Sequence, residues 1–165
     1  MNGAHWHLVL NHLPIIIPVI GLLIMISGFL FKSEILKRAA YCVIIVGALT
    51  AITAMSTGEE AEEIVEKING VDERFIEVHE EAAETFAILL YILGGVSLVG
   101  LWTNWKQKSF SNPVALATII FTVVVLFFAK QTGTTGGEIR HTEIRAESSS
   151  TMDSINQNKE EADDD

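Results

Sequence analysis

The sequence is poor in cysteine, in basic residues and in charge overall, and each shortage excludes a class of protein. Cys42 is the only cysteine among 165 residues, which excludes a secreted domain stapled by disulfides. Lysine and arginine total 11 against 21 acidic residues, so no basic face is present to bind nucleic acid. Charged residues form 19% of the chain and hydrophobic residues 49%, and the two kinds are segregated along it. This segregation excludes an ordinary water-soluble α/β enzyme.

The hydrophobic residues lie in four runs that carry almost no charge. These runs cover residues 13–31, 39–56, 82–103 and 113–129. A helix of about 20 residues crosses a hydrocarbon core of about 30 Å, and lipid forces the backbone to satisfy its own polar groups. Short connectors make successive helices antiparallel. The sequence therefore predicts an all-α membrane protein, an antiparallel four-helix transmembrane bundle over residues 1–145.

Basic residues mark one side of the predicted bundle. The connectors at residues 32–38 and 104–112 carry five basic residues and one acid. The other side receives both termini and the loop at residues 58–81, which contains ten acidic and two basic residues. Because basic residues concentrate in cytoplasmic loops, we expect a bacterial inner-membrane protein with both termini in the periplasm. The first 31 residues contain no lysine or arginine, which favours a retained first span over a signal peptide.

Two segments outside the spans have their own patterns. Residues 59–68 place apolar side chains on one face and glutamates on the other, which predicts a short amphipathic helix on the outer surface. Residues 146–165 are mostly serine, asparagine, glutamine and acid, which predicts a disordered acidic tail.

Small residues form stripes along the predicted spans and indicate close helix packing. One stripe runs through Gly47, Ala51, Ala54 and Gly58, and another through Gly94, Ser97 and Gly100. A polar path for ions is the alternative interpretation of such a stripe with its neighbouring threonines. No span carries a charged residue at its middle, which disfavours a transporter or pump acting alone.

All five histidines fall on the predicted outer side, although they come from three distant parts of the chain. They are His5, His7, His12, His79 and His141. The bundle topology brings the ends of the spans to one face. We therefore expect some of these imidazoles to meet there, close to the glutamates that flank the second and third spans.

Such a set of imidazoles suits two kinds of cofactor site. Haem iron takes two neutral imidazoles on opposite faces of a flat ring, which needs small neighbours such as Ala82 and Ala83, one turn after His79. We predict a haem b site formed by His12, His79 and His141. The alternative is iron or zinc bound by the imidazoles and carboxylates of His12, His79, Glu80, Glu84 and Glu59. No Glu-x-x-His pair repeats in two helices, which disfavours a ferritin-like di-iron site.

Four short motifs stand at the outer ends of the spans. They are Asn11-His12-Leu13-Pro14, Thr57-Gly58-Glu59-Glu60, His79-Glu80, and Thr132-Gly133 followed by Gly136-Gly137-Glu138-Ile139-Arg140-His141. In these motifs the chain resembles, over roughly residues 4 to 145, a family of small bacterial inner-membrane proteins of largely unknown function. The resemblance implies a four-helix membrane fold and a cytochrome-like or metal-linked role.

The expected function is electron transfer through the cofactor within a larger membrane complex, made with other subunits or with further copies of the chain. No nucleophile–base pair or phosphate-binding loop can be identified in the sequence, so a stand-alone enzyme is disfavoured. The competing hypothesis is a structural or accessory subunit without a cofactor, in which the histidines are interfacial and the small-residue stripes face partner helices.

Overall fold

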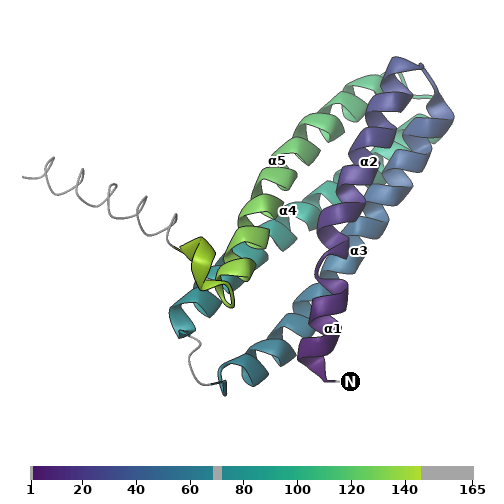
Figure 1. The fold of residues 1–165 in the computed structure, drawn as a ribbon. Coiled ribbons are helices and arrows are strands. Elements are labelled where there is room, and N and C mark those ends of the chain that lie inside the picture. Colours follow the sequence, from purple (N-terminus) through teal and green to yellow (C-terminus); the bar gives the residue numbers. More distant parts are fainter. Residues whose placement is uncertain (1, 69–71, 146–165) are drawn as a thin grey trace, which may run out of the picture.

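The computed structural model describes residues 2–68 and 72–145, and its elements are all helices (Figure 1). They are α1 (Gly3–Leu10), α2 (Leu13–Leu30), α3 (Glu34–Val65), α4 (Glu73–Trp105) and α5 (Ser111–Glu138). Helix α2 packs on α3, α3 on α4 and α4 on α5, while α5 also contacts α2. Four helical spans, with α1 and α2 together as the first, are long and apolar enough to cross a membrane. The chain is therefore an all-α membrane protein built as a four-helix bundle. The acidic tail expected at residues 146–165 lies outside the described residues.

Proline explains why the first span is divided into α1 and α2. Pro14 lies in the first turn of α2, and its ring would clash with the carbonyl of Leu10 if one helix continued through both. Helix α1 accordingly ends at Leu10, and His12 stands at the N-cap of α2 without a side-chain capping bond. The N-terminal segment is thus a short helix, begun by Asn2, whose side chain accepts from the backbone N–H of His5 at 3.1 Å.

Helices α3 and α4 extend well beyond the apolar runs that predicted them. They have 32 and 33 residues, which correspond to about 50 Å at 1.5 Å per residue, against a hydrocarbon core of about 30 Å. The prediction of a separate amphipathic helix at residues 59–68 was wrong, because residues 59–65 continue α3. Gly58 weakens a helix by only about 1 kcal/mol. Contacts between α3 and α1, together with the burial of Ala61, offset that cost.

Small residues let the helices approach closely, as the stripes predicted. Gly47, Ala51 and Ala54 are buried on α3, and Gly94, Ser97 and Gly100 are buried on α4. A methyl group added at Gly94 would lie 2.7 Å from the Cβ atom of Ala48 on the facing helix. The stripe on α4 therefore sets the distance between α3 and α4, while Gly47 on α3 lies against Pro18 of α2, so both stripes serve packing.

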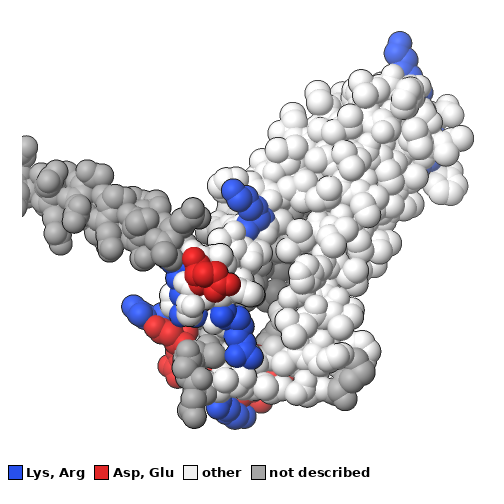
Figure 2. All heavy atoms as spheres, viewed as in Figure 1, with Lys and Arg blue, Asp and Glu red and all other residues white. Residues whose placement is uncertain are grey.

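The two ends of the bundle differ in charge and in shape. We call the end with the turns at residues 31–33 and 106–110 the connector end, and the end with α1 and the last turns of α3 and α5 the histidine end. On the face shown in Figure 2, the acidic atoms gather at the histidine end, and the long middle of the bundle is almost without charge. At the histidine end the bundle divides into two arms, α1 with the end of α3 and the start of α4 with the end of α5 (Figure 1).

Candidate functional site

Each arm of the histidine end holds one partly buried imidazole. His7 lies on α1 and turns toward α3, whereas His79 lies on α4 and turns toward α5. The two rings are close enough that their positive charges would repel each other when both are protonated. The fold thus brings together two histidines that are 72 positions apart in the sequence.

The hydrogen bonds of His7 fix which of its nitrogens carries the proton. Its Nδ1 lies 3.1 Å from the carbonyl oxygen of Ala54 and 3.4 Å from Oγ1 of Thr57. A carbonyl oxygen only accepts, so Nδ1 donates and the neutral ring keeps its lone pair on Nε2. The ring packs against Gly58, where an added Cβ atom would lie 3.4 Å from Cε1 of His7.

His79 reaches the same protonation by a different route. Its Nδ1 lies 3.2 Å from Oγ1 of Thr135, and that hydroxyl donates its own proton to the carbonyl oxygen of Thr132 at 3.1 Å. The hydroxyl then accepts from the ring, so Nδ1 of His79 carries the proton and Nε2 keeps the lone pair. Both imidazoles are therefore oriented through Nδ1, as metal-ligating histidines commonly are.

The end of α5 is fastened against the start of α4, which holds Thr135 and Gly136 beside His79. Arg145 donates to the carbonyl oxygens of Glu138 at 2.6 Å and Ile139 at 2.8 Å. Its guanidinium also lies 4.0 Å from the ring centre of Phe75, one turn before His79. A Cβ atom added at Gly136 would lie 2.9 Å from Cε1 of His79, so the imidazole would have to shift to accommodate a side chain there.

The other histidines named from the sequence are differently placed. His12 is exposed at the junction of α1 and α2, where its charge is felt by His7. His141 is exposed, and its Nδ1 lies 2.8 Å from Oε1 of Glu143. Of the expected set His12, His79 and His141, the structure thus gives only His79 a partly buried imidazole that is oriented by another helix. It adds His7, which the expected set did not include.

The carboxylates expected to ligate a metal do not converge with the imidazoles. Glu59, Glu80 and Glu84 are exposed, and Glu80 faces Glu62 closely enough for the two negative charges to repel. Among residues 2–68 and 72–145, no group of three or more histidine, cysteine or acidic side chains is placed to hold a metal ion. The structure therefore lends no support to the metal site of His12, His79, Glu80, Glu84 and Glu59.

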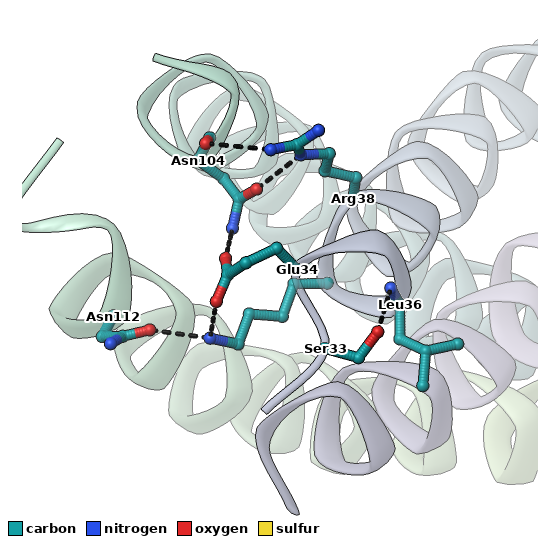
Figure 3. A network of polar contacts seen from close by, with 7 residues as sticks. Ser33, Glu34, Leu36, Arg38, Asn104 and Asn112 are labelled. Carbon is teal, nitrogen blue, oxygen red and sulfur yellow. Dashed lines mark hydrogen bonds and ion pairs between the residues drawn. The ribbon is translucent and has the colours of Figure 1, made fainter. Parts of the chain in front are cut away.

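A second polar cluster, which the sequence did not suggest, lies at the connector end (Figure 3). Lys37 is 4% exposed, and its Nζ donates to Oε1 of Glu34 at 2.8 Å and to Oδ1 of Asn112 at 2.7 Å. Asn104 accepts from Nε of Arg38 at 2.7 Å and donates to the other oxygen of Glu34. We call these five residues the connector network. It ties α3 to both α4 and α5.

No protein-family model, curated protein or solved structure matches the chain. The family resemblance expected from the four motifs therefore stays a prediction. The structure does show where the motifs lie. Thr57 and Gly58 touch the ring of His7, Gly136 touches the ring of His79, and Pro14 makes the bend that separates α1 from α2. Two of the motifs thus lie beside the two imidazoles, and a third contains His79 itself.

Proposed function

We propose that this membrane protein binds haem b between His7 and His79 and transfers electrons within a larger membrane complex. The observation that carries the proposal is the matched orientation of the two rings, each with Nδ1 at an oxygen atom of the protein, an arrangement that leaves the Nε2 lone pair for a ligand. The porphyrin of haem supplies four nitrogen ligands to the iron, so the iron needs only two ligands from the protein. A structural zinc site needs four protein ligands. The two oriented imidazoles at the histidine end therefore support haem better than zinc.

The residues of this chain fit such a group by their donor chemistry and by the small residues beside them. When bound, the haem iron would exchange one electron between its ferric and ferrous states. Ala54 and Thr135 would fix the orientation of the two imidazoles and raise the basicity of each Nε2, because their oxygens accept from Nδ1. Gly58 and Gly136 have no side chain that would press against the imidazole of His7 or of His79.

We further place the histidine end on the periplasmic side of a bacterial inner membrane. The support is the distribution of charge. The connectors at the opposite end carry five basic residues and one acid, whereas the histidine end carries an acidic excess. A site at the periplasmic face would exchange electrons with a partner at that face.

An absorption spectrum of the purified full-length protein, with haem and metal analysis of the same sample, tests the proposed function. We expect a Soret band that shifts on reduction, and about one haem per chain. A colourless, metal-free preparation, made from cells supplied with excess haem precursor, would overturn the proposal and favour a structural subunit. Zinc or non-haem iron in stoichiometric amount would instead overturn the haem assignment in favour of the alternative metal site.

A further inference from the structure

A shallow pocket of about 270 Å³ lies at the connector end, on the side of the connector network. Its lining is polar and comes from α3, from the end of α4 and the turn after it, and from the start of α5: Glu34, Arg38, Asn104, Gln107, Lys108 and Ser111. Gln107 has φ 51°, which turns the chain so that the backbone N–H of Lys108 reaches the carbonyl oxygen of Thr103 at 2.9 Å. The turn thereby holds the Lys108 side chain at the pocket.

The charge inside this pocket is positive. The carboxylate of Glu34 is engaged at both oxygens, by Lys37 and by Asn104, and Lys37 balances its charge. Arg38 and Lys108 then set the sign of the pocket. Arg38 gives Asn104 two of its five N–H donors, which leaves a guanidinium with further capacity to donate.

The start of α5 adds to this positive potential. Helix α5 begins after Phe110 without a side-chain capping bond, and Ser111 at its first position lines the pocket. A long helix carries partial positive charge at its N-terminus, where backbone N–H groups point outward. An anion in the pocket would therefore meet two cationic side chains, a hydroxyl and the end of a helix.

A neighbouring apolar surface indicates that the anion belongs to a lipid. Nζ of Lys108 lies 5.8 Å from the ring centre of Trp102, which is 53% exposed on the flank of α4. Trp102 lines a second, mostly apolar hollow, with Leu98, Leu101, Trp105 and Lys106. Tryptophan side chains at a helix end mark the level of lipid headgroups. The charged pocket and the apolar hollow thus lie at the depth where a phospholipid changes from phosphate to acyl chain.

We propose that this pocket binds the phosphate group of an anionic phospholipid, with an acyl chain against the apolar hollow beside Trp102. Basic pockets between transmembrane helices are known to take such headgroups. Lys108 and Arg38 would contact the phosphate oxygens, and Ser111 would donate a hydrogen bond. Bound in this way, the lipid would join the turn after α4 to α3 and thereby strengthen the connector end.

The test uses the full-length protein, delipidated in mild detergent and titrated with phosphatidylglycerol or phosphatidylcholine while thermal unfolding is followed. Lys108→Gln removes a pocket charge, and Lys32→Gln removes the same charge from the exposed turn between α2 and α3, at the same end but outside both the pocket and the apolar hollow. We expect phosphatidylglycerol to raise the unfolding temperature of the wild type more than phosphatidylcholine does. We expect Lys108→Gln to weaken the apparent affinity about fivefold and Lys32→Gln to change it less than twofold.

Inorganic phosphate in a parallel titration distinguishes the two sources of the same anion. Stabilisation by phosphate that equals the effect of phosphatidylglycerol, and that Lys108→Gln abolishes, would overturn the lipid assignment in favour of a soluble anion. Equal weakening by Lys32→Gln and Lys108→Gln would overturn the pocket, because general surface charge would then explain the binding. Lys108→Glu should weaken phosphatidylglycerol binding more than Lys108→Gln, and an unchanged affinity in both variants would contradict the proposal.

Discussion

The two ends of the bundle both place polar side chains between helices, but they use their hydrogen bonds differently. At the connector end, one oxygen of Glu34 accepts from Lys37 and the other from Asn104, and Lys37 also donates to Asn112. At the histidine end, the hydrogen bonds of His7 and His79 engage one ring nitrogen each. A polar network that satisfies itself serves stability, whereas oriented groups that keep one strong ligand atom indicate binding.

The largest effect expected from this comparison is loss of the cofactor when either imidazole is removed. His7→Ala and His79→Ala should each lower haem content by at least about tenfold, because iron then keeps one protein ligand. His12→Ala and His141→Ala are the matched controls, since both rings are exposed at the same end, and they should keep the wild-type haem content. Haem extraction and the Soret absorbance measure the four variants together. Retained haem in His7→Ala, with loss in His12→Ala, would restore the assignment made from the sequence.

The next largest effect concerns stability and belongs to the connector end. Asn104→Ala should lower the free energy of unfolding by about 2 kcal/mol, because Asn104 is 2% exposed and bonds both Arg38 and Glu34. Asn112→Ala removes one bond to Lys37 from an exposed side chain, so we expect a loss of about 0.5–1 kcal/mol. Chemical unfolding in detergent compares the two variants. A larger loss for Asn112→Ala would show that Asn104 is not the centre of the network.

A smaller effect should follow when an imidazole loses only its orienting partner. Thr135→Val removes the oxygen that accepts from Nδ1 of His79, and we expect haem affinity to fall about tenfold while the protein stays folded. Thr134→Val is the control, because Thr134 is exposed and bonds only the carbonyl oxygen of Lys130 within its own helix. Haem titration of the apoprotein measures both affinities. If the two variants bind haem equally well, Thr135 has no orienting role.

The smallest expected effect distinguishes two glycines of α5 that are three residues apart. Gly136→Ala would place a methyl group 2.9 Å from Cε1 of His79, which should shift the ring and weaken haem affinity a few-fold. Gly133→Ala meets nothing within 4 Å and should leave affinity unchanged while stabilising the helix by up to about 1 kcal/mol. The same titration and unfolding experiments apply. Equal haem affinity in both variants would remove Gly136 from the site.

The sequence was sufficient for the fold because membrane crossing depends on length and polarity alone. Four apolar runs predicted four helices, and the glycines at positions 47 and 94 predicted where they approach. The lengths of α3 and α4 were underestimated, since a helix does not stop where its apolar face ends. Periodicity beyond Gly58, with Ala61 in line with the buried stripe, was the signal for one continuous helix.

The candidate site was harder to predict because it depends on which faces meet. His79 could be chosen from its place before a span. His7 could not, since its ring is oriented by Ala54 and Thr57 on another helix. One local signal was present. Gly3 and His7 are one turn apart on α1, and both face the small or polar residues that end the stripe on α3. The connector network joins residues about 70 positions apart, and no local pattern indicates such pairs.

The most direct measurement of the central claim is the electron paramagnetic resonance spectrum of the oxidised, haem-loaded full-length protein. We predict the low-spin ferric signal of an iron with two imidazole ligands in the wild type, and its loss in His7→Ala and in His79→Ala alike. A high-spin ferric signal in the wild type, or a low-spin signal that survives removal of either imidazole, would contradict haem ligation by His7 and His79.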